Sequence, residues 1–286
     1  MTGTVIRGLR AIADRFDYVL LDQWGALHEG KALFPEAHDC VLALHAAGKP
    51  VLVLSNSGRR AVDNLHRLDR MGLPPETYDG VLTSGEVAWQ GLRDGATAPF
   101  AGLGKVCFLV TRGGDRSVVE GLDLDIVRDI ARADFILLGG LDDDLADLDA
   151  WRGPLTKAAA RRTPMLCANP DLTMFGAGGA LLPAPGALAR AYETLGGKVA
   201  YIGKPHAPIF AAALDVLGHP PPERVLMIGD SLTHDILGGR SAGLLTLLIT
   251  SGVHREELST DLAASLAKLA GSEARMPHWV IDRLVW

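Results

Sequence analysis

The chain has 286 residues, 48% of them hydrophobic, and a formal net charge of -6 from 28 basic and 34 acidic side chains. This length can bury the core of one large domain or of two ordinary ones. The charges form no basic stripe, and no apolar run approaches the roughly 20 residues that cross a bilayer. We therefore expect neither nucleic acid nor a membrane as a partner.

The cysteines and the first residues bear on the compartment. Cys40, Cys107 and Cys167 are widely spaced and form no ligand-like pair, which favours reduced, buried thiols. The first residues contain Asp14, Asp17 and only short apolar stretches, so they do not resemble a signal peptide. We expect a cytoplasmic protein.

Two apolar runs near the start end in polar residues. A short helix over residues 6–16 is expected to lead into residues 18–21, an apolar run without helical period that is typical of a buried parallel strand and is followed by Asp22. A predicted helix over residues 35–47 leads to a second strand, residues 50–54, which runs into Ser55. Ligands of open α/β sheets bind beyond the carboxyl ends of the strands, so Asp22 points to a site, although on this stretch alone it could equally cap a turn.

The pattern continues with a helix over residues 60–71 and a strand over residues 80–83, and restarts between residues 85 and 198. There we predict strands at residues 106–110, 134–138 and 165–168, and helices near residues 117–122 and 144–161. This stretch has the size of a small second domain.

The last third returns to the first pattern. We predict a strand over residues 198–202 that leads to Lys204, a helix over residues 208–217, and a strand over residues 225–228 that leads to Asp230. A helix from about residue 233 carries Asp235 in its first turn, and residues 244–249 form the last strong strand. Alternating strands and helices predict an α/β fold with a doubly wound parallel sheet.

The polar residues at these strand ends share a chemistry. They comprise a hydroxyl, a lysine and three carboxylates: Ser55, Lys204, Asp22, Asp230 and Asp235. Carboxylate oxygens are the ligands that Mg²⁺ prefers, and the lysine and hydroxyl can hold phosphoryl oxygens. One carboxylate can attack phosphorus and form an aspartyl-phosphate.

Four motifs carry a resemblance to a known family. Residues 22–25 (Asp-Gln-Trp-Gly), 54–56 (Leu-Ser-Asn), 202–205 (Ile-Gly-Lys-Pro) and 228–235 (Ile-Gly-Asp-Ser-Leu-Thr-His-Asp) resemble, in order, the motifs of the haloacid dehalogenase (HAD) superfamily. The long insertion, with Asn-Pro-Asp at residues 169–171, resembles subclass IIA with its NagD-like and p-nitrophenyl phosphatase-like enzymes. The resemblance implies a Rossmann-like core of residues 1–84 and 199–286, with a smaller α/β cap domain of residues 85–198.

The resemblance also implies roles for individual residues. Asp22 would be the nucleophile, and Ser55 and Lys204 would bind the transferring phosphoryl group, although Lys204 taken alone reads as a solvated surface lysine. Mg²⁺ would be held by Asp22, Asp230 and the backbone carbonyl of Trp24, with Asp235 supporting it. The phosphate and substrate would further be bound by Asn56, Asn169 and Asp171, the last two on the cap.

One residue departs from the family pattern. Phosphatases of this superfamily usually carry a second aspartate two residues after the nucleophile, as general acid, and here that position is Trp24. General acid catalysis raises the reaction rate roughly 100- to 10,000-fold. Its loss should slow the hydrolysis of alkyl phosphates, which have poor leaving groups, more than that of aryl or acyl phosphates. His28 and Glu29 are candidate substitute acids if the loop folds back, whereas an exposed loop histidine is the ordinary alternative.

We therefore expect a Mg²⁺-dependent phosphatase that acts on a small phosphorylated metabolite through an aspartyl-phosphate on Asp22. Relatives that break carbon–halogen or carbon–phosphorus bonds carry caps between the first two motifs. This chain has only a helix-sized segment there, so we do not expect either of those reactions. Because Trp24 replaces the usual acid, a phosphate-binding protein with weak or no catalytic activity is an alternative. A third alternative is a scaffold protein without a phosphate site. A cap with exposed apolar surface could form a homodimer.

Overall fold

The computed structural model describes residues 3–176, 179–258 and 261–286, and the chain divides into two compact units. The core unit consists of residues 1–55, 62–82 and 204–286, and the cap unit consists of residues 56–61 and 83–203. The cap unit therefore contains residues 56–61, 83–84 and 199–203, which the sequence analysis assigned to the core domain.

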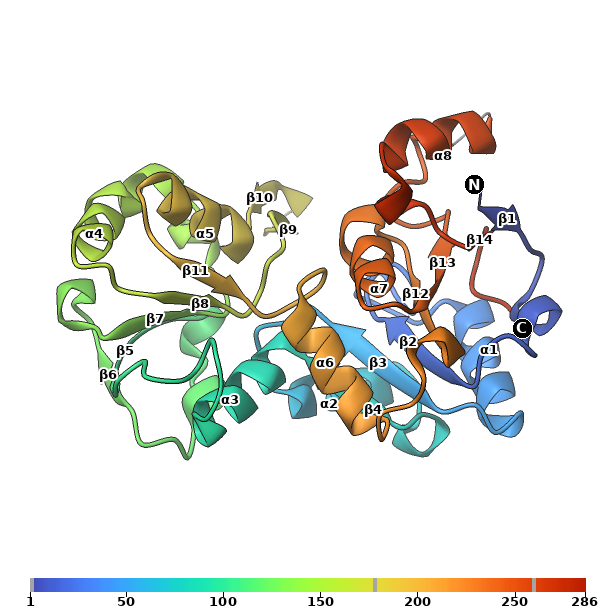
Figure 1. Cartoon of the computed structure of the whole chain (residues 1–286), viewed down its shortest axis with the longest axis horizontal. Coiled ribbons are helices and arrows are strands. Elements are labelled where there is room, and N and C mark those ends of the chain that lie inside the picture. The colour runs from blue at the N-terminus through green and yellow to red at the C-terminus, as the bar shows by residue number, and fades with distance from the viewer. Residues whose placement is uncertain (1–2, 177–178, 259–260) are drawn as a thin grey trace. The chain divides into compact units, whose positions relative to one another are not determined.

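The core unit is built on a seven-stranded sheet whose pairings from β1 to β3 are all parallel. In order across the sheet the strands are β1 (Thr4–Val5), β14 (Trp279–Ile281), β13 (Leu245–Ile249), β12 (Val225–Gly229), β2 (Tyr18–Asp22), β3 (Val51–Ser55) and β4 (Gly80–Thr83). Figure 1 shows blue strands from the start of the chain beside orange and red strands from its end.

The order of these strands positions the site. From β2 the chain moves outward through β3 to β4, and from β12 it moves outward the other way through β13 to β14. The direction of winding therefore reverses between β2 and β12, which lie side by side. Loops that leave the carboxyl ends of two such strands diverge and leave room for a ligand.

Burial explains why these strands form. All five residues of β12 and the last four of β2 are buried, so side chains on both faces are covered, as in parallel sheets flanked by helices. Each fully buried valine, leucine or isoleucine favours the fold by about 1.5 to 3 kcal/mol relative to exposure. The helices of this unit are α1 (Pro35–Ala46), α2 (Ala61–Arg70), α6 (Ala207–Val216), α7 (Leu237–Ser241) and α8 (Leu262–Ala270).

The cap unit contains a second, five-stranded parallel sheet. Its strands, in order, are β11 (Val199–Tyr201), β8 (Met165–Cys167), β7 (Phe135–Leu138), β5 (Val106–Val110) and β6 (Asp125–Val127). Its helices are α3 (Ser84–Asp94), α4 (Leu148–Ala160) and α5 (Pro185–Thr194), and β9 (Thr173–Phe175) pairs with β10 (Leu181–Pro183). Here the winding reverses between β5 and β7.

The structure confirms the doubly wound parallel α/β fold and corrects three local predictions. The strand before Lys204 is β11, which pairs with β8 of the cap sheet and not with a core strand. The predicted helices at residues 6–16 and 117–122 are short 3₁₀ turns, Leu9–Ile12 and Ser117–Val119. No helix among the described residues is long and apolar enough to span a membrane.

Candidate active site

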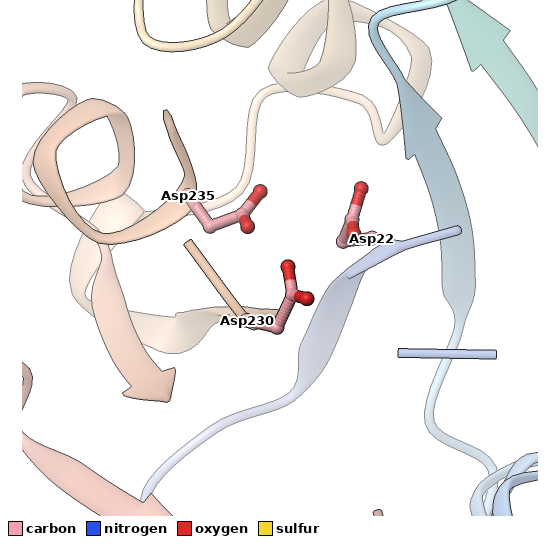
Figure 2. A group of neighbouring side chains, drawn as sticks. All are labelled: Asp22, Asp230 and Asp235. Atoms are coloured by element: carbon pink, nitrogen blue, oxygen red, sulfur yellow. The ribbon is translucent and has the colours of Figure 1, made fainter. Parts of the chain in front are cut away.

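Three carboxylates meet at the point where the core sheet reverses its winding. Asp22 ends β2, Asp230 follows β12, and Asp235 lies in a π-helical turn, Leu232–Ile236. All three are buried, and each offers an oxygen within 4.8 Å of the others. Figure 2 shows the three carboxyl groups converging from these separate segments. Buried carboxylates gathered at this distance are suited to a shared cation.

Lys204 supplies the positive charge of the cluster. Its side chain is buried, and Nζ donates hydrogen bonds to Asp22 Oδ1, to Asp235 Oδ1 at 2.8 Å and to the carbonyl of Leu54 at 3.2 Å. All three donor positions of the ammonium are thereby used. Lys204 is therefore a fixed, buried charge between two carboxylates, and not a solvated surface lysine.

The charges of this cluster do not balance. Burial raises the pKa of Asp22, and the nearby carboxylates of Asp235 and Asp230 add to that effect while Lys204 opposes it. Burial, followed by Asp235, raises the pKa of Asp230 to about 7. Burial would lower the pKa of Lys204, but Asp22 and Asp235 outweigh it and hold the pKa above its ordinary value. Three carboxylates against one ammonium suit the addition of a divalent cation, which would favour the ionised form of each carboxyl.

Backbone groups hold two of the carboxylates in place. Asp235 Oδ2 accepts from the backbone N–H of Ser231 at 3.1 Å, and Asp230 Oδ2 accepts from the N–H of Val253 at 2.8 Å. Gly25, with φ of +83°, lies so close to Asp230 that a Cβ there would overlap the carboxylate. Sequence reasoning missed Val253, which lies in the loop that follows β13.

Ser55 is the last residue of β3, next to β2. The register pairs Asp22 with Leu54, so Ser55 lies one residue beyond the partner of Asp22 at the carboxyl edge of the same sheet. It is half-buried. Ser55 therefore lies at the sheet edge where the sequence analysis placed it.

Three other predicted residues gather separately in the cap unit. Asn56 Nδ2 donates to Asp171 Oδ1 at 2.8 Å, and the backbone N–H of Asp171 donates to Asn169 Oδ1 at 3.0 Å. Asn169 also lines a cavity of about 160 Å³ with residues that follow β5 and β7. The amide of Asn56 is thus bound to a carboxylate that lies 115 positions further along the chain.

The loop after Asp22 is organised by His28. The ring is 1% exposed, Nδ1 accepts from the N–H of Gly30 at 3.0 Å, and Nε2 lies 3.1 Å from Nε2 of Gln23. Because Nδ1 accepts, Nε2 carries the proton, and a half-turn of the Gln23 amide would bring its otherwise unpaired Oε1 onto that proton. Burial, and then the charge of Arg67, lowers the pKa of His28 to about 4.

His28 is therefore a neutral, buried ring at pH 7, which argues against the substitute acid suggested by the sequence. Glu29 is exposed and lines a separate core cavity of about 130 Å³ with Arg255 and Arg283. Trp24 is 47% exposed, and its ring lies edge-to-face against the His28 ring with centroids 5.6 Å apart. Neither the indole nor the buried imidazole offers an acidic proton at neutral pH.

Comparison with known proteins identifies the family. A family described as haloacid dehalogenase-like hydrolase matches residues 19–125, and one described as HAD-hydrolase-like matches residues 201–285. These two matches include the segments that carry Asp22, Ser55, Lys204 and Asp230.

Related proteins match over nearly the whole chain. The structure of a haloacid dehalogenase-like hydrolase from Brucella suis is 30% identical, covers 98% of this chain and 100% of its own, and has a TM-score of 0.81. Glycerol-3-phosphate phosphatase from Gallus gallus is 29% identical over 85% of this chain and 82% of its own. A glycerol phosphate phosphatase from Mycobacterium tuberculosis in complex with calcium is 25% identical over 94% of this chain and 74% of its own, with a TM-score of 0.69. The chain therefore belongs to the haloacid dehalogenase-like hydrolases, in subclass IIA, and is a hydrolase of the phosphatase type.

Proposed function

We propose that the protein is a Mg²⁺-dependent phosphatase that cleaves a small phosphorylated metabolite in the cytoplasm through an aspartyl-phosphate on Asp22. The observation that carries the proposal is the buried cluster of Asp22, Asp230 and Asp235 around Lys204. Its charge suits a phosphoryl group only when a divalent cation is added, because three carboxylates would otherwise repel the dianion.

The reaction divides into two displacements. A carboxylate oxygen of Asp22 attacks phosphorus, the bond from phosphorus to the ester oxygen breaks, and the electron pair leaves with that oxygen. Water then attacks the aspartyl-phosphate, which releases inorganic phosphate and restores the Asp22 carboxylate. Ser55 and Lys204 would hold phosphoryl oxygens during both steps, Lys204 by exchanging one of its hydrogen bonds to a carboxylate for one to the phosphoryl group.

The cation would be held by Asp22 and Asp230, with the backbone carbonyl of Trp24 as a further ligand and Asp235 in support. Magnesium usually takes one or two carboxylates from the protein and completes its octahedron with water and substrate phosphate. When bound, it supplies charge neutralisation between the carboxylates and the phosphoryl group. Fixed contacts from Val253 to Asp230 and from Ser231 to Asp235 keep the ligands aligned before binding.

A second candidate is a phosphate-binding protein with little or no turnover. Trp24 in place of an acid, together with a neutral His28, favours it, because an alkoxide that leaves without a proton is a poor leaving group. In that case the cluster would bind phosphate esters without cleaving them.

The experiment is steady-state hydrolysis of p-nitrophenyl phosphate with Mg²⁺ and with a chelator, for the natural protein and for Asp22→Asn. We expect turnover that requires Mg²⁺ and falls by at least about a thousandfold in Asp22→Asn. The matched control is Asp142→Asn, which changes a carboxylate that accepts from Gly113 in an exposed loop of the cap unit. Turnover that survives in Asp22→Asn would refute the nucleophile assignment. Mg²⁺-dependent thermal stabilisation by phosphate without any turnover would favour the second candidate.

A further inference from the structure

The indole of Trp24 is held in place although much of it is exposed. Its ring packs edge-to-face on the His28 ring, with centroids 5.6 Å apart and planes at 83°. Gly30, with φ of +101°, lies against it so closely that a Cβ would come within 2.5 Å of Trp24 Cη2. Yet 47% of the residue is exposed. An aromatic ring packed on backbone and held at one edge presents an ordered apolar surface to solvent.

This surface is tied to the reacting groups. Trp24 is two residues after Asp22, and the next residue, Gly25, lies against the Asp230 carboxylate. The N–H of Gly25 donates to the carbonyl of His28 at 2.9 Å, and the N–H of Gly30 donates to the His28 ring. One short loop therefore fixes both the backbone beside Asp230 and the indole, which belongs to a residue only two positions after Asp22.

Where phosphatases of this family usually carry a general acid, this loop carries the indole of Trp24. Nδ1 of His28 accepts a hydrogen bond, and Nε2–H faces the Gln23 amide in the buried interior of the loop. The indole N–H donates hydrogen bonds but is not an acid. Without a proton from Trp24 or His28, the departing oxygen keeps the electron pair of the broken bond as an oxyanion. A phenol has a pKa of about 10, whereas an alkyl alcohol is a far weaker acid, so an aryl oxygen leaves far more readily.

The exposed, ordered indole and the missing general acid both favour an aromatic leaving group. We propose that Trp24 is a specificity-determining platform on which a planar aromatic leaving group stacks, and that the substrates of this protein are aryl phosphates. The inference rests on the proposed phosphatase function for its kinetic part only. Asp22 takes the phosphoryl group, the aryl oxygen departs with the electron pair as a phenolate, and water later releases inorganic phosphate.

Three substrates separate stacking from leaving-group chemistry. Phenyl phosphate has an aromatic ring and an aryl oxygen, benzyl phosphate has a ring on an alkyl oxygen, and cyclohexyl phosphate has neither feature. We expect kcat for phenyl phosphate to exceed that for the other two by at least about a hundredfold, because only it needs no acid. Equal kcat values for the three would overturn the leaving-group part of the proposal.

The stacking part is measured by binding in Asp22→Asn, where calorimetry gives Kd in the presence of Mg²⁺ without turnover. Phenyl and benzyl phosphate should bind about two- to tenfold more tightly than cyclohexyl phosphate. The additional change Trp24→Leu should abolish that difference and leave the Kd of cyclohexyl phosphate nearly unchanged. Trp286→Leu, which alters another tryptophan of the core unit, is the matched control and should preserve the difference.

Two further variants keep the test decisive if Trp24→Leu does not fold. Trp24→Phe should retain part of the preference for aromatic rings. Gly30→Ala should reduce it by displacing an intact indole, because the added Cβ overlaps Trp24. A Trp24 variant that weakens all three ligands equally would mean that the indole only supports the loop, and would overturn the platform. A natural protein that hydrolyses no ester would refute the phosphatase function, while the binding comparison would still decide the role of Trp24.

Discussion

The two units use the same topology for different chemistry. In the core unit the winding reverses between β2 and β12, and in the cap unit it reverses between β5 and β7. The loops after the core strands carry Asp22 and Asp230, with Lys204 and Asp235 beside them. The loops after the cap strands line the 160 Å³ cavity with Thr111, Arg112, two glycines and Leu141.

The difference lies in burial and charge. Lys204 is 2% exposed and lies between two carboxylates, whereas the Arg112 side chain is 45% exposed and pairs with Asp143 at 2.7 Å. Among the described residues, the only cluster of carboxylates close enough together to share a metal ion lies in the core unit. The core reversal point thus concentrates buried charge, and the cap reversal point offers backbone, Arg112 and a small cavity. Topology places a site, and the residues at the strand ends decide its chemistry.

Removing one cation from each unit tests this contrast most strongly. Lys204→Met should destabilise the metal-free core unit by about 3 to 5 kcal/mol, because it leaves buried carboxylates without their counter-charge. Arg112→Met should cost no more than about 1 kcal/mol, because its ion pair is largely solvated. Hydrogen exchange of peptides from β2 and from β5, measured with a chelator, reports each unit separately.

Added Mg²⁺ should recover part of the stability lost in Lys204→Met, since the cation can compensate the carboxylates. Equal losses of protection in the two variants would contradict the view that only the core reversal point holds a buried charge cluster.

A pH titration compares two buried groups of the core unit, since His28 is neutral whereas Lys204 is charged. The pKa of His28 is about 4 in the folded protein against 6.5 when unperturbed, owing to burial and the charge of Arg67. Between these values only the unfolded chain binds the proton, so stability is full above pH 6.5 and falls as the pH drops toward 4. The loss attributable to His28 is up to about 3 kcal/mol.

His28→Gln keeps an acceptor for the Gly30 N–H and cannot be protonated, so its free energy of unfolding should fall less between pH 6.5 and 4 than that of the natural protein. Urea denaturation at several pH values measures this. His219→Gln, which changes an exposed histidine of the same unit, is the matched control. Half-buried His278, whose pKa burial and Arg240 also lower, and Asp230, whose pKa burial raises to about 7, contribute to the profiles of both variants alike. Identical profiles for the natural protein and His28→Gln would show that His28 is not buried and neutral.

Much of the core sheet could be predicted because its strands are continuous apolar runs with abrupt polar ends. The predicted strands at residues 18–21, 50–54, 225–228 and 244–249 lie within one residue of β2, β3, β12 and β13. The sequence analysis missed β1 and β14, which have only two and three residues. Nor does an apolar run reveal which sheet it joins, which is why β11 was assigned to the core.

The site, too, could be predicted only where the signal lies in the local sequence. Residues that end strands could be found from local sequence, and so could the order of the motifs that contain Lys204 and Asp235. Contacts between segments far apart left no local signal: the Leu54 carbonyl on Lys204, the Val253 N–H on Asp230 and the Asn56 amide on Asp171 depend on the finished fold. The interior position of His28 was equally hidden, because a loop histidine is usually exposed.

The smallest expected effect concerns the pair Asn56 and Asp171, which tests whether the cap unit holds its strand-end residues by local hydrogen bonds. The 2.8 Å bond from a buried amide to a carboxylate should give a coupling free energy of about 1.5 kcal/mol in a double-mutant cycle of Asn56→Ala and Asp171→Ala. Hydrogen exchange should place the loss in peptides around β8 and leave β2 protected, since both residues belong to the cap unit. If the predicted phosphate-binding role of Asn56 depends on this pairing, the two single variants and the double variant should lower kcat/KM by a similar factor. Additive losses of activity would instead mean that Asn56 and Asp171 act on the substrate independently.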